Sequence, residues 1–169
     1  MCIRDSAVGV VAVTPPWNFP YAIPAGGVLA ALMAGNSVIL KPARESVLTA
    51  YQLAQQMWKA GVPKEVLQFL PLIDGATGKK LITDPRIAAV ILTGSYFTAA
   101  MFQEWRPDLA LYAETSGKNS LVISVAADVD LAIKDLVKGA FGHAGQKCSA
   151  TSLAPVSYTH LTLPTTPYV

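Results

Sequence analysis

Residues 8–42 read VGVVAVTPPWNFPYAIPAGGVLAALMAGNSVILKP, and this stretch decides the fold class. The apolar, β-branched run at 8–13 predicts a strand. Residues 23–34 are rich in Ala and Leu and predict a helix that ends at Gly35-Asn36. Residues 37–42 predict a second strand, which its final proline stops. Because a helix joins the two strands, they are expected to form a βαβ unit and to lie parallel.

The same alternation continues beyond this stretch. We expect strands at 66–70, 88–92 and 109–113, and helices at 47–60, near 78–83 and after Ser95. Ser46 is the expected N-cap of the helix at 47–60. Right-handed crossovers then give an α/β fold with a doubly wound, Rossmann-like parallel sheet. The composition agrees, because 52% hydrophobic and 14% charged residues suit strands that are buried on both faces.

The pattern changes after Gly117, which suggests a second domain. Residues 120–125 predict another strand, and residues 128–141 predict an amphipathic helix that leads to Cys148. We therefore expect one α/β domain at 7–117 and the start of a second α/β domain at 118–154. Residues 1–6 and 155–169 resemble translated adapter sequence and are expected to be non-native tails, so that the chain is a fragment.

Composition and charge exclude several classes of protein. The net charge of +2 is too small and too dispersed for a nucleic-acid-binding protein. Residues 7–40 carry no charge, but prolines and glycines interrupt them, so no membrane span is expected. We expect no signal peptide, because the N-terminus lacks a basic segment followed by an apolar one. Of the two cysteines, Cys2 lies in a doubtful tail, so we expect no disulfide, a reducing compartment and a cytoplasmic location.

Polar residues follow the predicted strands at the points where those strands end. They are Asn18, Lys41, Gly94-Ser95 and Glu114. Ligands of open parallel sheets bind at the carboxyl ends of the strands, so these residues are expected to share one edge. Asn18 is either part of a rigid proline-flanked turn or an amide donor for an oxyanion. Lys41 is either solvated or holds a sugar hydroxyl or phosphate, and Gly94-Ser95 offers backbone N–H groups to a phosphate.

Cys148 and Glu114 suggest covalent chemistry. A thiol that attacks a carbonyl forms a thioester, and a carboxylate that activates water hydrolyses it. Other interpretations stay open at this point: Cys148 as an inert small hydrophobe, Glu114 as the partner of Lys118, and His143 as the base of a cysteine hydrolase. The hydrolase is disfavoured because no third group that would orient His143 is evident.

Five motifs in order give the chain a specific resemblance. They are PWNFP at 16–20, KPA at 41–43, TGS at 93–95, ETSGKN at 114–119 and FGHAGQKCSA at 141–150. Through them, residues 7–154 resemble the aldehyde dehydrogenase superfamily. The resemblance implies that Cys148 is the nucleophile, Glu114 the general base and Asn18 an oxyanion donor.

The resemblance also implies a nicotinamide cofactor and roles for the two domains. Residues 7–117 would form part of an NAD(P)-binding domain, and residues 118–154 would begin a catalytic domain with the nucleophile loop. The cofactor-binding residues implied are Thr14, Pro15, Trp17, Lys41, Gly94, Ser95 and Thr115. No metal site is expected. NAD-dependent members often carry Glu where this chain has Arg44, so we expect NAD, with NADP as the alternative.

Within the superfamily, the last two motifs are most similar to L-glutamate γ-semialdehyde (1-pyrroline-5-carboxylate) dehydrogenase of the bacterial form fused to proline dehydrogenase. That likeness implies that Lys147 and Ser149 hold the substrate's α-carboxylate and that Phe19 packs on its aliphatic part. The parent enzyme is then expected to oxidise this small aldehyde in proline catabolism, as a homo-oligomer. A general or CoA-acylating aldehyde dehydrogenase and an inactive cofactor-binding fragment are the alternatives, and the isolated chain is expected to be inactive.

Overall fold

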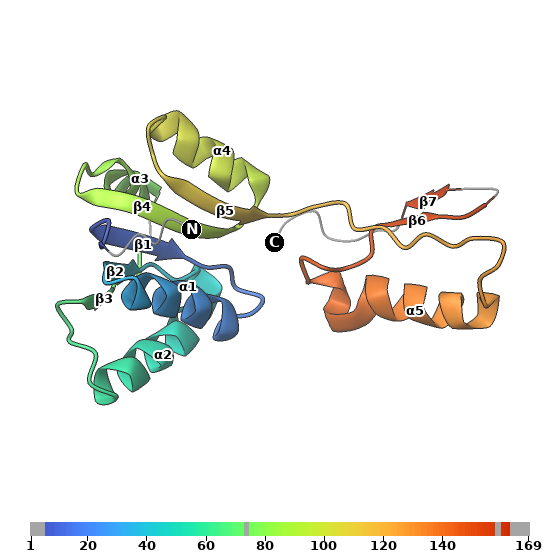
Figure 1. Cartoon of the computed structure of the whole chain (residues 1–169), viewed down its shortest axis with the longest axis horizontal. Coiled ribbons are helices and arrows are strands. Elements are labelled where there is room, and N and C mark those ends of the chain that lie inside the picture. Colours follow the sequence, from blue (N-terminus) through green and yellow to red (C-terminus); the bar gives the residue numbers. More distant parts are fainter. Residues whose placement is uncertain (1–5, 73–74, 158–159, 163–169) are drawn as a thin grey trace. The chain divides into compact units, whose positions relative to one another are not determined.

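The computed structural model describes residues 6–72, 75–157 and 160–162. The chain divides into two compact units, Met1–Thr115 and Ser116–Val169. The expected tails at 1–6 and 155–169 lie largely outside the described residues. Figure 1 shows the helices and strands of each unit along the chain.

The first unit is built on a five-stranded parallel sheet, which confirms the predicted fold class. Its strands are β1 (Val10–Thr14), β2 (Ser37–Leu40), β3 (Leu67–Phe69), β4 (Ile87–Gly94) and β5 (Leu111–Thr115). They lie in the order β3-β2-β1-β4-β5, so the chain winds outward from β1 in both directions. The helices between them are α1 (Ala22–Met33), α2 (Val47–Lys59), α3 (Gly75–Thr83) and α4 (Tyr96–Trp105).

Two apolar clusters, one on each face, hold the helices against the sheet. Val11 and Val13 of β1 pack with side chains of α1 and α2, whereas Ala12 between them packs with side chains of α3 and α4. Figure 1 shows the same pairing of helices around the sheet. The central strand is therefore buried on both faces, which is why the sequence reads as near-continuous apolar runs.

Helix α1 ends just before Gly35-Asn36, as the sequence predicted. Gly35 adopts a φ of +80°, and its N–H donates to Leu32 O at 2.9 Å. The Asn36 side chain then ties the helix end to the start of β1. Its Oδ1 accepts from Val8 N at 2.7 Å and Gly9 N at 3.1 Å, and its Nδ2 donates to Ala31 O. The expected helix at 23–34 is thus shifted by one residue and ended as predicted.

Two local expectations in the first unit were wrong. Ser46 precedes α2, but its hydroxyl donates to Ala43 O instead of capping the helix, because a short 3₁₀ turn, Arg44–Ser46, comes first. The fifth strand was expected at 109–113 but begins at Leu111. Leu109 belongs to a turn in which its N–H donates to Arg106 O at 3.1 Å. The strand consequently includes Glu114 and Thr115.

The second unit contains α5 (Val129–Phe141), a 3₁₀ turn (Gly142–Gly145) and the antiparallel pair β6 (Leu153–Pro155) and β7 (His160–Thr162). Asp128 caps α5 by accepting from Leu131 N at 3.0 Å. The strand expected at 120–125 is not formed. Isolated parallel bridges instead join Ser120 to Leu153 and Ile123 to Val156, and Leu121 N and Ile123 N donate to Leu153 O and Pro155 O at 2.9 and 2.8 Å. Among the described residues, no helix has the length and apolarity that crossing a membrane requires.

Candidate active site

The predicted polar residues of the first unit lie at the carboxyl edge of its sheet. Thr14 ends β1, Lys41 directly follows β2, and Ser95 directly follows β4. In the neighbouring strand, Glu114 pairs with Thr93 and Thr115 pairs with Gly94. Because all five strands are parallel, these positions share one edge, as the sequence pattern predicted.

A cavity of about 180 Å³ opens at this edge, between the ends of β1 and β2 and the helices α3 and α4. Its polar lining comes from Thr14, Lys41, Arg44 and Thr98, and its apolar wall includes Phe102 and Trp105. The two aromatic rings are stacked with their centroids 5.7 Å apart. Two cations beside an apolar wall fit a nucleotide, whose phosphates are anionic and whose base is flat.

Glycines keep one side of this cavity open. Gly75 and Gly78 lie in α3 and line the cavity, and a Cβ added at either would meet no atom within 4 Å. These two glycines are therefore not needed for packing within the unit. Their lack of side chains leaves room for a ligand beside the helix.

Lys41 is half-buried in the cavity wall, and its surroundings lower the pKa of its ammonium group. Burial lowers the pKa of the Lys41 ammonium, the nearby Arg44 lowers it further, and Glu45 opposes the two. Among the described residues, neither Lys41 nor Arg44 forms an ion pair. An anionic group bound between the two cations would relieve their repulsion.

Ser95 begins α4 in the way that the sequence predicted. Its Oγ accepts from Thr98 N at 3.1 Å and lies 3.0 Å from Thr98 Oγ1. The Ser95 hydroxyl is thus engaged in capping the helix. A phosphate at this turn would accordingly rely on backbone N–H groups at the start of α4.

Asn18 and Glu114 differ in their exposure. Asn18 lies between β1 and α1 and is 6% exposed, so its amide is held inside the unit rather than in solvent. Phe19 and Trp17 beside it are half-buried. Glu114 is exposed at the end of β5, where a water molecule can reach its carboxylate.

Cys148 belongs to the second unit and lies in the loop after α5. It is an exposed free thiol, flanked by the exposed residues Lys147 and Ser149. Two non-glycine residues before it, His143 and Ala144, have φ values of 57° and 55°, and Gly145 continues this left-handed stretch with 71°. Left-handed backbone costs about 1–2 kcal/mol at a non-glycine residue, so the surrounding hydrogen bonds must hold this loop in shape.

The predicted site residues are consequently divided between the two units. The structure gathers Thr14, Lys41, Ser95 and Glu114 at one sheet edge of the first unit, and it places Cys148 between Lys147 and Ser149 in one loop of the second. One residue that contacts this loop, Asn119, was not predicted from the sequence. Asn119 donates from Nδ2 to the backbone oxygens of Cys148 and Ala150. Its place in the ETSGKN motif gave no signal of these contacts.

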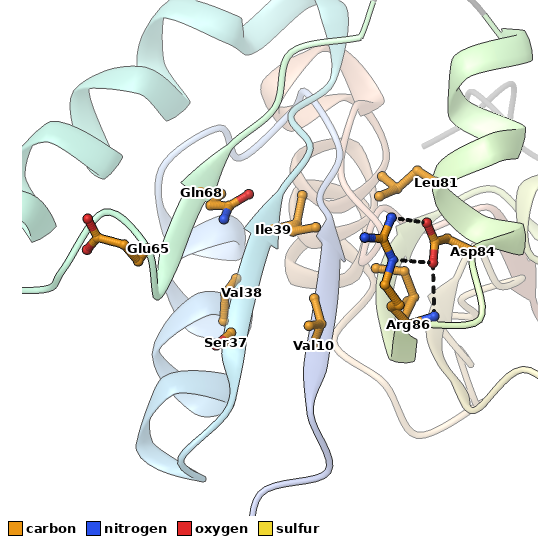
Figure 2. A pocket seen from close by; sticks show the side chains of 10 residues that line it. Val10, Ser37, Val38, Ile39, Glu65, Gln68, Leu81, Asp84 and Arg86 are labelled. Atoms are coloured by element: carbon orange, nitrogen blue, oxygen red, sulfur yellow. Dashed lines mark hydrogen bonds and ion pairs between the residues drawn. The ribbon is translucent and has the colours of Figure 1, made fainter.

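A second cavity, of about 350 Å³, lies at the opposite edge of the same sheet (Figure 2). It is lined by Val10, Ser37 and Ile87, which begin β1, β2 and β4. Beside them Arg86 forms an ion pair with Asp84 at 2.7 Å, and hydrogen bonds from Arg86 lower the pKa of Asp84 to about 2. Despite its larger volume, this cavity lies at the amino ends of the strands, where parallel sheets do not place their ligands.

Comparisons with known proteins identify the family of this chain. Residues 1–159 match the aldehyde dehydrogenase family. The chain belongs to the aldehyde dehydrogenase family. It is 42% identical over 158 residues to a 1-pyrroline-5-carboxylate dehydrogenase of Staphylococcus haemolyticus, a match that covers 89% of this chain and 31% of the relative. The chain thus spans about a third of the length of this curated aldehyde dehydrogenase.

Solved structures give the same relationship. The structure of Proline Utilization A (PutA) from Corynebacterium freiburgense has a TM-score of 0.84 and 46% identity, covering 88% of this chain and 15% of that one. A structure described as an E. coli NADP dependent enzyme has a TM-score of 0.83 and 30% identity, covering 89% of this chain and 32% of that one. Both support the aldehyde dehydrogenase fold for this chain.

Proposed function

We propose that this chain is part of an aldehyde dehydrogenase that oxidises L-glutamate γ-semialdehyde to L-glutamate in proline catabolism. The observation that carries the proposal is the gathering of Lys41, Ser95 and Glu114 at one carboxyl edge, in a member of this family. The relative named 1-pyrroline-5-carboxylate dehydrogenase supports the choice of aldehyde. The mechanism draws on residues of both units.

The proposed reaction starts at Cys148. Its thiolate attacks the aldehyde carbon, and the Asn18 amide and the Cys148 backbone N–H stabilise the oxyanion, each such donor being worth about 3 kcal/mol. A nicotinamide cofactor held by Lys41, Ser95 and the other proposed cofactor residues would supply the acceptor for the hydride. Cys148 then holds the product as a thioester. Glu114 takes a proton from water, the oxygen attacks the thioester carbon, and the C–S bond breaks to release glutamate and the Cys148 thiolate.

The first unit is the proposed cofactor-binding domain, and NAD is the proposed cofactor, with NADP also accepted. The residues proposed to hold it are Thr14, Pro15, Trp17, Lys41, Gly94, Ser95 and Thr115. Arg44 lines the same cavity as Lys41 and offers a positive charge for a 2′-phosphate. The likeness to an NADP dependent enzyme of E. coli supports this second cofactor.

Arg44→Glu should weaken NADP binding about tenfold more than NAD binding, because only NADP carries the 2′-phosphate that the new carboxylate would repel in addition to the shared pyrophosphate. Equilibrium titration of both cofactors against the purified chain measures this. Arg86→Glu is the matched control, since it makes the same charge change at the opposite edge of the sheet. Equal losses of NAD and NADP affinity in Arg44→Glu would contradict the assignment.

The α-carboxylate of the substrate is the proposed partner of Lys147 and Ser149, with Phe19 on the aliphatic part. In the enzyme that contains this chain, Lys147→Ala should lower kcat/KM for glutamate semialdehyde by about tenfold and affect an uncharged aldehyde much less. The steady-state reduction of the cofactor with each aldehyde measures the difference. Lys134→Ala, an exposed lysine of α5, is the control. A uniform loss with both aldehydes would remove Lys147 from substrate recognition.

Assembly and location follow from the same proposal. The likeness to Proline Utilization A supports a parent protein in which this enzyme is fused to proline dehydrogenase, and we propose that the parent is a homo-oligomer. Cys148 is a free thiol, which fits the reducing conditions of the cytoplasm.

A further inference from the structure

Asn119 connects two segments of the second unit through both its side chain and its backbone. Its Nδ2 donates to the carbonyl oxygen of Cys148 and, at 3.1 Å, to that of Ala150. Its own carbonyl oxygen accepts from Ser152 N at 2.9 Å and from Leu153 N at 3.1 Å. Asn119 therefore binds the chain at Cys148, within the turn that carries the thiol, and at Ala150, Ser152 and Leu153 after it.

Hydrogen bonds hold the loop around Cys148, including Gln146 N to His143 O and Thr151 N to Gly139 O, both at 3.0 Å. Lys147, Cys148 and Ser149 are exposed, whereas Gly145 and Ala150 before and after them are buried. A turn in which Ala150 N donates to Lys147 O at 3.0 Å closes over Cys148 and Ser149. The two bonds from Asn119 then fix the direction of the carbonyl groups within and after that turn.

We propose that Asn119 is a positioning residue, which orients the Cys148 backbone so that its N–H meets the oxyanion formed when the thiol attacks a carbonyl. This inference rests on the proposed function, because it assumes that Cys148 is the nucleophile. Fixing one carbonyl of a tight turn restricts the rotation of the adjoining peptide groups, and the Cys148 N–H is one of them. A donor that acts on an oxyanion must be held in place before the reaction.

The side-chain role can be separated from the backbone role. Asn119→Asp keeps the shape of the side chain and the bonds to the Asn119 carbonyl, but the carboxylate cannot donate to Cys148 O or Ala150 O. Asn119→Ala removes the same donors without adding a charge. Asn36→Ala is the matched control, because Asn36 also joins two segments through its side chain, but in the first unit.

The test compares two reactions of the same thiol, in chains that also carry Cys2→Ser so that only Cys148 reacts. With p-nitrophenyl acetate, the thiolate attacks the ester carbonyl, the C–S bond forms through an oxyanion, and nitrophenolate leaves with the electron pair of the C–O bond. With iodoacetamide, the thiolate displaces iodide and no oxyanion forms. The ratio of the acylation rate to the alkylation rate therefore reports oxyanion stabilisation and is insensitive to exposure of the thiol.

We expect the unsubstituted chain to show a higher ratio than glutathione, and Asn119→Asp and Asn119→Ala to lower it by about fivefold. Asn36→Ala should keep the ratio. If the Asn119 variants also keep it, the inference is overturned while the proposed nucleophile stands. If the unsubstituted chain has the same ratio as glutathione, no oxyanion donor acts on Cys148 in this chain and the inference is overturned, whereas the proposed function is tested separately by Cys148→Ala in the enzyme that contains the chain. Should Asn119→Asp not fold, Asn119→Ala decides alone.

Discussion

Cys148→Ala should abolish aldehyde oxidation in the enzyme that contains this chain, lowering kcat by about 10⁴-fold or more. The reason is chemical, since without the thiol no carbon–sulfur bond forms and no intermediate arises from which a hydride can leave. Cys148→Ser should also be inactive, because a hydroxyl is a much weaker nucleophile than a thiolate. The rate of cofactor reduction at saturating aldehyde measures the loss.

Cofactor binding separates this chemical loss from a damaged fold. Cys148 lies in the second unit, whereas the proposed cofactor residues Lys41 and Ser95 lie in the first. The Cys148→Ala protein should therefore bind NAD with unchanged affinity. Substantial oxidation by Cys148→Ala would assign the nucleophile to another residue and revive the interpretation of Cys148 as an inert thiol.

The sheet could be predicted from the sequence because its signals are local and agree with one another. Residues 8–13 are apolar on both faces of β1, and Gly35 ends α1 with the φ of +80° that its glycine permits. The segment at 120–125 has the same apolar composition and does not become a strand. Whether a run becomes a strand depends on its neighbours, and here the segment at 153–156 pairs with it through isolated bridges at Ser120 and Ile123.

The candidate site likewise includes residues whose positions the sequence predicts and one whose contacts it does not. Lys41, Ser95 and Glu114 could be placed at one edge, because the direction of parallel strands fixes where their ends lie. Asn119 could not be found in this way. Asn119 contacts Cys148 O in a loop in which His143 and Ala144 take left-handed conformations, and although histidine is enriched in them, one histidine does not predict such a backbone. Tertiary hydrogen bonds of this kind leave no periodic trace in the sequence.

Glu114→Gln should block hydrolysis of the thioester and spare the earlier attack of Cys148 on the aldehyde. The carboxylate ends β5 and is exposed, so it is available to take a proton from water, which an amide cannot do. We expect kcat to fall by about 10³-fold. Cys148 should still attack the aldehyde, so one equivalent of reduced cofactor should form in a rapid burst, after which the thioester accumulates. Rapid-mixing absorbance with glutamate semialdehyde, followed by mass measurement of the Cys148 peptide, checks both outcomes.

The steady-state rate of Glu114→Gln distinguishes the proposed hydrolysis from transfer of the acyl group to coenzyme A. A CoA-acylating enzyme does not need Glu114, so its Glu114→Gln variant would turn over normally when the thiol is supplied. Glu104→Gln, an exposed glutamate of α4, is the matched control and should leave both phases unchanged. A normal steady-state rate in Glu114→Gln would remove the general-base role. Loss of the burst together with turnover would instead place Glu114 in the attack by Cys148, ahead of the thioester.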